Sequence, residues 1–258
     1  VNVDVTAPGA TLALGLMFLK TNSASVAARL EVPNTNFLLQ YVRPDLVLLR
    51  VLSRSLVLWD SIAPTAEWVE AQMPQIVKRA VPEFDRNNIL AEQGKQKKDE
   101  SGSWVEDLDT LRHVHANIVA GSCLAIGLRY AGSAEKRAKD LLISYLTQFQ
   151  NKRARCEGFR KVDKQLMETC IGIAAISASL VMAGTGDVEL LRICRGLRER
   201  VDSELQYGHH MAIGIAIGFL FLGGGRATLC TSNQAIAALI IALYPRFPIS
   251  TSDNRYHL

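Results

Sequence analysis

A short apolar motif that recurs along the chain constrains its fold more than any other feature. Copies begin at Leu12, Leu124, Ile176 and Ile215, and they read LALGLMFLKTN, LAIGLRYAGSA, ISASLVMAGTG and IAIGFLFLGGG. The last two copies follow at 52 and 39 residues, and the gap of 112 residues after the first copy leaves room for degenerate ones. A unit of about 40 residues is typical of solenoids, in which each repeat packs on its neighbours.

Small residues recur at fixed places in this motif. They let neighbouring helix backbones approach closer than the usual separation of roughly 8–10 Å. The ninth place holds glycine in three copies and lysine in the first, and glycine there ends the helix because it adopts the left-handed conformation at little cost. The positions are Ala13, Ala125, Ser177 and Ala216 in second place, Gly15, Gly127, Ser179 and Gly218 in fourth place, and Lys20, Gly132, Gly184 and Gly223 in ninth place.

A second, amphipathic helix is predicted after the turn. In DVELLRICRGLRERV, Asp187 is a suitable N-cap, and the apolar residues share one stripe while the arginines lie elsewhere. That stripe holds Leu190, Leu191, Cys194, Leu197 and Val201. We therefore predict an all-α solenoid, a partial ring whose units each have a buried inner helix, a tight glycine turn and a half-exposed outer helix.

One repeat domain is predicted to span residues 1–258, with repeat signatures near 8–30, 119–146, 170–201 and 209–243. Residues 34–81 are helical in character but lack the glycine signature, so we interpret them as a divergent repeat with an extra helix. The polar stretches 85–107 and 150–165 interrupt the regularity and are predicted to be mobile loops.

The second polar stretch contains a candidate surface for a partner. We call Arg153, Arg155, Arg160 and Lys161 the partner patch, and it could receive an acidic protein. A solvated loop is the plainer interpretation, and a nucleic-acid contact is a third. The net charge of +4 is too weak to support nucleic-acid binding by itself. Among the partners we expect no nucleic acid, no membrane and no small-molecule substrate.

Three stretches of about 18 residues lack charge, but their strongly apolar parts are shorter than the roughly 20 residues that a membrane helix needs. The glycines Gly223–Gly225 are not followed by the Lys-Ser/Thr of a phosphate loop, so we interpret them as the turn of a repeat. No cofactor is expected.

Histidines and cysteines are the remaining candidates for chemistry. His113 and His115 are two apart, which on a helix turns them to different faces, and His209 and His210 have no glutamate at metalloprotease spacing. No metal site or catalytic residue is predicted. The five cysteines are scattered, and four lie in apolar or amphipathic runs where free cysteine behaves as a small buried hydrophobe. A toroidal enzyme would need a polar cluster at the ring's centre, whereas the inner helices present Ala, Gly, Ile and Leu.

Several of these segments resemble proteasome/cyclosome repeats, above all the last 40 residues beginning GFLFLGGGRATL and the segment Trp59–Val77. That family includes the two largest non-ATPase subunits of the proteasome base and the largest subunit of the anaphase-promoting complex. The Trp59–Val77 segment and the closing TSDNRYHL resemble the latter branch. The resemblance implies a toroid with inner and outer rings of helices. Four or five units are too few to close one, so we expect a central piece of a longer subunit with apolar end faces.

The resemblance also implies a function. It is that of a non-catalytic scaffold in a ubiquitin ligase that controls the cell cycle, located in the nucleus and cytoplasm. The implied partners are the cullin and RING module, the substrate-receptor subunit and an arm of helical-repeat proteins. A repeat scaffold of the proteasome base is the alternative, and an enzyme of the helical-toroid kind is a more distant one.

Overall fold

The computed structural model describes residues 3–82, 103–155, 161–202 and 205–253, and within these ranges the chain is all-α, as predicted. The α-helices are α1 (Val3–Met17), α2 (Ala24–Arg29), α3 (Asn36–Tyr41), α4 (Pro44–Val57), α5 (Ala66–Ala71), α7 (Ser103–Arg129), α8 (Lys136–Arg155), α9 (Lys161–Val181), α10 (Val188–Arg198), α11 (Tyr207–Leu220) and α12 (Asn233–Ala242). Residues 75–82 are also helical, and short 3-10 turns occur at Trp59–Ser61 and Leu222–Gly224.

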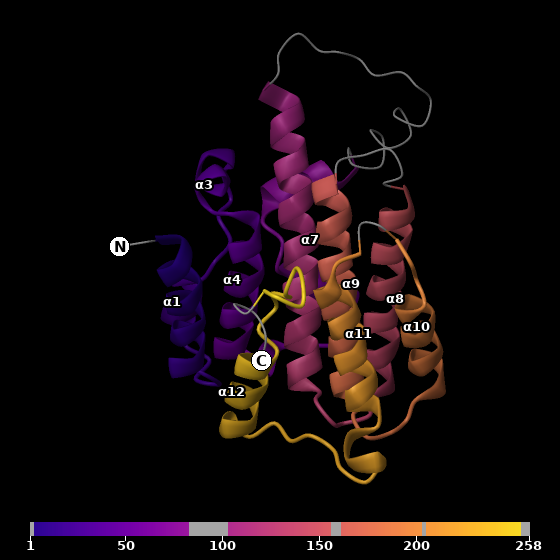
Figure 1. Ribbon diagram of the computed structural model, residues 1–258. Helices are drawn as coiled ribbons and strands as arrows, with labels where there is room; N and C mark the ends of the chain where they lie inside the picture. The colour runs from indigo at the N-terminus through magenta and orange to yellow at the C-terminus, as the bar shows by residue number, and fades with distance from the viewer. Residues whose placement is uncertain (1–2, 83–102, 156–160, 203–204, 254–258) are drawn as a thin grey trace.

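Five helices form one curved layer, which we call the inner stack (Figure 1). α4 packs between α1 and α7, and α9 packs between α7 and α11, so the order is α1, α4, α7, α9, α11. Residues on several sides of α7 and α9, such as Ile126, Leu128, Ala174 and Leu180, are at most 1% exposed. These helices are apolar nearly all round because each has neighbours on both sides.

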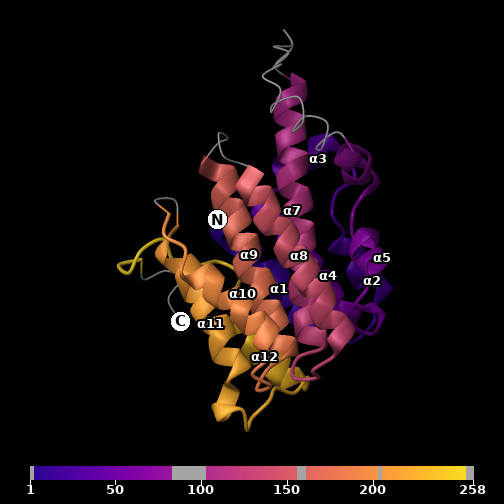
Figure 2. The same cartoon turned by 90° about the vertical axis from the view of Figure 1, so that its right-hand side faces the viewer.

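The outer helices cover one side of this stack. α8 packs on α9 and α7, while α10 packs on α11 and α9. Figures 1 and 2 show α2 and α5 on the opposite side of the stack from the C-terminal segment. In α10, Leu190, Cys194 and Leu197 are buried, as the predicted stripe requires. Val201 is fully exposed at 100%, against the prediction, because the helix ends at Arg198 and the stripe ends with it.

The predicted loop over residues 150–165 is wrong for the residues that the structure describes. α8 continues to Arg155, and α9 begins at Lys161. Basic residues in the last turn of a helix stabilise the negative end of its dipole, so this charge favours helix rather than loop. Similarly, residues 103–107 belong to α7, while residues 83–102 and 156–160 lie outside the described parts.

The last unit departs from the predicted arrangement. Its second helix, α12, lies on the inner side of the curved stack rather than the outer side (Figures 1 and 2). The connecting residues run back beneath the earlier turns. Thr228 Oγ1 donates to the carbonyls of Gly132 and Ala183 at 3.2 Å, and Lys20 Nζ donates to the carbonyl of Thr231. These side-chain bonds hold the reversed segment that begins after the left-handed Gly225.

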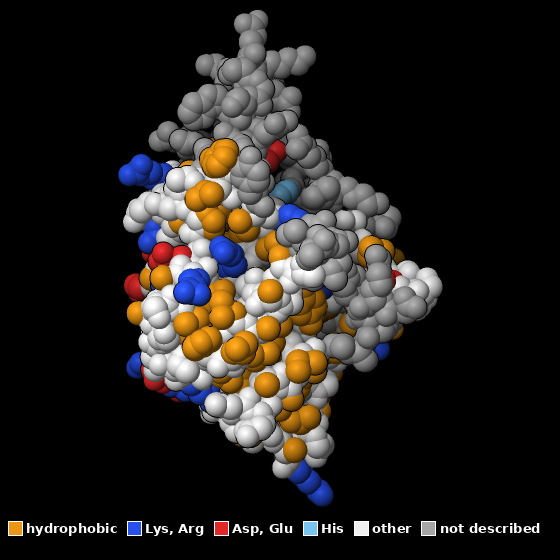
Figure 3. All heavy atoms as spheres, turned by 90° about the vertical axis from the view of Figure 1, so that its left-hand side faces the viewer, with side chains coloured by type: hydrophobic (Ala, Val, Ile, Leu, Met, Phe, Trp, Pro, Cys, Tyr) orange, Lys and Arg blue, Asp and Glu red, His pale blue; other side chains and the backbone are white. Residues whose placement is uncertain are grey.

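Both ends of the inner stack expose apolar surface, as predicted. At the α1 end, Met17 is 76% exposed, Phe37 64% and Leu38 49%, and Figure 3 shows apolar side chains spread across this face. At the α11 end, Phe221 is 45% exposed. Among the described residues, Tyr207–Gly224 is long and apolar enough to cross a membrane by length and composition. Within the structure, 33% of this window is buried.

Candidate functional site

The small residues of the motif form the contacts between inner helices. A Cβ built on Gly127 of α7 would lie 2.8 Å from the Cα of Ser177 on α9. A Cβ on Gly15 of α1 would lie 2.8 Å from the Cβ of Ser53 on α4. Real Cβ atoms do not approach this closely, so these helices touch through their backbones. We call these contacts the repeat seam.

Both seam contacts follow one rule, in which the fourth place of a unit meets the second place of the next inner helix. Ser53 therefore occupies the second place of a motif copy that the sequence analysis missed. That copy reads LSRSLVLWDSI from Leu52, with Ser55 in its fourth place, so residues 34–81 do carry the motif with serine in place of glycine. A search that accepted any small residue at these two places would have found it.

The turns join the same pairs of helices through backbone hydrogen bonds. In the copies that begin at Leu12, Leu124 and Ile176, the ninth- and eleventh-place residues are left-handed, and their N–H groups donate to carbonyls in the last turn of the next inner helix. The bonds are Gly132 to Leu180 at 2.8 Å, Ala134 to Val181 at 3.0 Å, and Lys20 to Leu56, Asn22 to Val57, Gly184 to Phe219 and Gly186 to Leu220 at 2.9 Å. Helix C-termini leave carbonyls without partners, and here the preceding turn supplies the donors.

An aromatic side chain adds contacts where the turn after α4 meets the neighbouring units. Trp59, in the turn after α4, lies 4.8 Å from Lys20 Nζ and 5.5 Å from the guanidinium carbon of Arg129, measured to its ring centroid. Tyr130 Oη donates to the carbonyl of Ile62 at 3.4 Å. Cation–π contacts of this kind contribute about 0.5–2 kcal/mol, so Trp59 connects the first three units.

The motif positions divide by location. Gly15, Ala125, Gly127, Ser177, Ser179 and Ala216 are buried, whereas Ala13 and Gly218 are exposed on the outermost inner helices α1 and α11. A Cβ on Gly218 would meet no atom within 4 Å. In ninth place, Gly132, Gly184 and Gly223 all have positive φ, as predicted for a turn.

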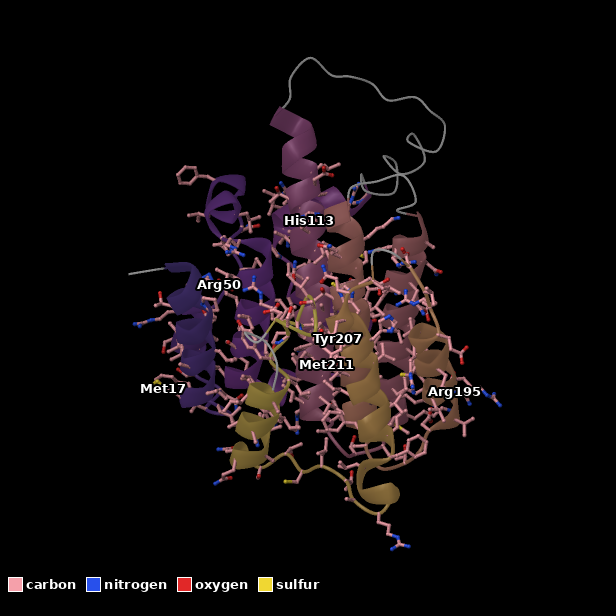
Figure 4. All side chains as sticks on the ribbon, in the orientation of Figure 1. Met17, Arg50, His113, Arg195, Tyr207 and Met211 are labelled. Carbon is pink, nitrogen blue, oxygen red and sulfur yellow. The ribbon has the colours of Figure 1, made fainter. Side chains whose placement is uncertain are left out.

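A cavity of about 400 Å³ lies on the inner side of the curved stack, and we call it the concave cavity. Residues from α1, α4, α7, α9 and α11 line it, and Tyr244–Phe247 complete its wall. Figure 4 labels one lining residue, His113, on the upper part of α7. The lining residues are Pro8, Arg43, Leu46, Leu48, Leu49, His113, Asn117, Leu166, Thr169, Gln206, His209, Tyr244, Pro245, Arg246 and Phe247.

This lining corrects the expectation of an apolar centre, since it contains two arginines, two histidines and no carboxylate among the described residues. His209 is buried, and its Nδ1 accepts a hydrogen bond from the backbone N–H of Gln206 at 3.1 Å. Burial lowers the pKa of His209, and Glu168 opposes that shift. The imidazole is therefore neutral at pH 7, with its proton on Nε2.

His113 and His115 face different sides of α7, as predicted. His113 lines the concave cavity, whereas His115 lines a second cavity of about 210 Å³ beside Glu70 of α5 and Tyr145 of α8. Burial, and then the charge of Lys152, lower the pKa of His115 to about 4. Burial also raises the pKa of Tyr145 to about 12. Both groups are therefore uncharged at pH 7.

Arg153 is the member of the partner patch whose side chain the structure describes, and it serves an internal ion pair. It pairs with Glu168 of α9 and with Asp202. Glu168 is 2% exposed and also accepts two hydrogen bonds from Arg200, at 2.9 and 2.8 Å. Arg153 thus holds α8 against α9. Arg155 and Lys161 lie at helix ends, and Arg160 lies outside the described residues.

The cysteines partly follow the prediction. Cys123, Cys170 and Cys194 are buried free thiols, whereas Cys230 is exposed in the reversed segment, and Cys156 lies outside the described residues. Burial raises the pKa of Cys123, that of Cys170 to about 12 and that of Cys194 to about 11. Across the described ranges, no three His, Cys, Asp or Glu side chains are grouped to hold a metal ion.

Comparison with known proteins connects this geometry to a family. A family model described as the APC1 fifth domain matches residues 1–258. The chain is 45% identical to anaphase-promoting complex subunit 1 of Dictyostelium discoideum over 100% of the chain and 12% of that protein. It is 42% identical to the Homo sapiens protein of the same name, over 100% of the chain and 13% of that protein. A protein named negative regulator of mitosis, from Emericella nidulans, is 40% identical over 99% of the chain and 12% of its own length. The chain thus spans about an eighth of the length of these relatives.

Proposed function

This chain belongs to the anaphase-promoting complex subunit 1 family, where it corresponds to the fifth domain, and we propose that it is a non-catalytic scaffold segment of the anaphase-promoting complex. Family membership disfavours the alternative of a proteasome-base subunit. The proposed role is to hold other subunits of a cell-cycle ubiquitin ligase at fixed separations, in the nucleus and the cytoplasm.

The observation that carries this proposal is the double connection that joins α1 to α4 and α7 to α9. Each backbone contact in the repeat seam is paired with two hydrogen bonds from the turn, as at Gly127–Ser177 and Gly132–Leu180. Closely packed interiors transmit displacement rather than absorb it. A stack joined at both the middle and the end of its helices therefore suits the transmission of fixed distances.

Fixed distances are useful to a ligase with separate catalytic and substrate-binding parts. Holding both on one rigid body raises the effective concentration of the substrate at the catalytic module. We propose that the cullin and RING module, the substrate-receptor subunit and the helical-repeat arm are the partners so held. The exposed end faces at Met17 and Phe221 support a further proposal, that adjoining repeats extend the inner stack toward a ring.

The test compares two glycines of the full-length protein, tagged and expressed in dividing cells. Gly127→Leu places a side chain in the repeat seam, whereas Gly196→Leu in α10 places the same side chain where a Cβ meets no atom within 4 Å. Affinity purification followed by mass spectrometry should recover cullin, RING and helical-repeat subunits with the wild type and with Gly196→Leu. Recovery with Gly127→Leu should be reduced. If the wild type recovered no ubiquitin-ligase subunits, the proposed function would be wrong.

A further inference from the structure

We propose that the concave cavity binds an acidic peptide segment, taking a carboxylate between Arg43 and Arg246 and a neighbouring apolar side chain against its leucines. This goes beyond the scaffold role, because it places a ligand site on the inner side of the stack. The cavity's volume of about 400 Å³ falls within the roughly 300–1,000 Å³ that is usual for ligand sites.

The charge of the lining favours an anion. Arg43 precedes α4, and Arg246 lies in the segment after α12, so the two guanidinium groups come from different walls. No described lining residue is acidic. Both arginines also contact other groups of the chain. A guanidinium carries five N–H donors in a planar fork, so the same group can serve an internal partner and a ligand carboxylate together.

Two helix N-termini add to this positive potential. α4 begins at Pro44 after Arg43, without a side-chain cap, whereas α11 begins at Tyr207 after Gln206, which forms a capping box with His209. Both residues that precede these helices, Arg43 and Gln206, line the cavity. Each helix has 14 residues, and the positive end of a helix dipole stabilises an anion by about 0.3–1 kcal/mol.

Neutral groups complete the site. Leu46, Leu166 and Phe247 provide apolar walls, while Asn117 and Thr169 provide uncharged polar groups. His209 lines the same cavity as a neutral imidazole whose Nδ1 is already used, so Nε2–H is the donor that it can offer. Apolar walls beside a pair of arginines suit a carboxylate side chain followed by an apolar one. An isolated small anion would leave the apolar walls uncovered.

The test measures binding to the full-length protein by fluorescence anisotropy. The probe is a fluorescein-labelled hexapeptide of alternating leucine and glutamate, with a leucine–glutamine hexapeptide as the uncharged control. The cavity variant is Arg43→Gln with Arg246→Gln. The matched control is Arg192→Gln with Arg195→Gln, two exposed residues of α10 that do not line the cavity; Figure 4 shows Arg195 well apart from His113. Both doubles remove two positive charges, and thermal unfolding checks that both remain folded.

The glutamate peptide should bind, and the cavity variant should weaken its binding by about tenfold or more, as expected for the loss of charge-assisted hydrogen bonds. The α10 variant should retain wild-type affinity. Hydrogen exchange should show that the peptide protects residues 43–49 and 244–247. The proposal would be overturned if the glutamate peptide did not bind or if the glutamine peptide bound equally well. It would also be overturned if both double variants lost the same affinity for the glutamate peptide.

Inorganic phosphate separates the two sources of negative charge. Millimolar phosphate should compete weakly with the glutamate peptide, because it cannot fill the apolar part of the cavity. If phosphate protected residues 43–49 while the peptide did not bind, the site would be one for small anions and the peptide proposal would be wrong. None of these readouts depends on the recovery of ligase subunits, so this proposal and the scaffold proposal fail separately.

Discussion

Gly127 and Ser177 touch backbone to backbone, since a Cβ on Gly127 would lie 2.8 Å from the Ser177 Cα and 2.9 Å from its carbonyl oxygen. The obstructing atoms are main-chain atoms, which cannot rotate away as a side chain can. The only relief is to move α7 from α9. This contact therefore fixes the separation of the two most buried helices of the inner stack.

Gly127→Ala should lower the free energy of unfolding by about 1–3 kcal/mol, because the added methyl group overpacks the seam. Gly218→Ala is the matched control on α11, where a Cβ meets nothing within 4 Å. It should raise the free energy of unfolding by about 0.5–1 kcal/mol, since alanine favours helix over glycine. Urea denaturation followed by circular dichroism measures both. Effects of the same sign would contradict the seam. The motif alone predicts a close helix contact at both glycines, because both hold its fourth place.

A second pair of glycines tests the turns. Gly184 has a φ of +74°, and a Cβ there would overlap the carbonyl oxygen of Ala227, whereas Gly224 has a φ of +66° and open space. Gly224→Ala should cost only the left-handed strain, about 1–2 kcal/mol. Gly184→Ala should cost about 1–3 kcal/mol more, by overpacking against the reversed segment. Thermal unfolding that gave equal losses would show that Ala227 does not pack on this turn.

The buried carboxylate of Glu168 should contribute strongly to stability. Glu168→Gln removes the anion that Arg153 and Arg200 share, and only Arg153 keeps a second carboxylate, that of Asp202. The side chains of Arg153 and Arg200 are 17% and 24% exposed. We expect a loss of about 2–3 kcal/mol, somewhat below the range for fully buried pairs because water reaches both arginines. Asp109→Asn, which removes the partially exposed pair with Arg112 at 3.4 Å, is the control and should cost about 0–1 kcal/mol. Equal effects in chemical denaturation would argue against the role of Glu168.

His115 should make stability depend on pH. Its pKa of about 4 in the folded chain lies below the usual 6.5, so the unfolded chain binds more protons between these values. The free energy of unfolding should therefore fall as pH drops from about 6.5 toward 4, by at most about 3 kcal/mol from this group. Urea unfolding at pH 7 and pH 5 should show a smaller drop for His115→Gln than for the wild type. Identical drops would mean that His115 is not buried as described.

Thiol reactivity should distinguish the cysteines. Cys230 is exposed, and hydrogen bonds from Ser232 lower its pKa, so iodoacetamide at pH 7.5 should modify it readily. Cys123, Cys170 and Cys194 should react only after unfolding, because burial both shields them and raises their pKa values. Peptide mapping by mass spectrometry reads each site separately. Rapid labelling of Cys123 in the folded protein would contradict the packing of α7 on α9.

The sequence by itself determined which helices and turns each repeat unit contains. The apolar inner helices, the left-handed turns at Gly132 and Gly184, and the buried stripe of α10 all depend on residues within about a dozen positions of one another. The opposite directions of His113 and His115 follow from helix geometry alone. The motif copies that contain glycine could be recognised in the sequence. The copy at Ser53 was not recognised, because serine replaces glycine as its small residue.

What only the tertiary structure decided depends on residues far apart in the chain. Arg153 was predicted to face a partner, but Glu168 and Asp202 approach it only once α8 and α9 pack side by side. The concave cavity has Arg43 and Arg246 in its lining. The segment before α12 runs back along the stack, where Thr228 donates to the carbonyls of two earlier turns. Helix periodicity is a local property of the sequence. Which charges meet and which cavities close are set by the curvature of the whole stack, so they become visible only in three dimensions.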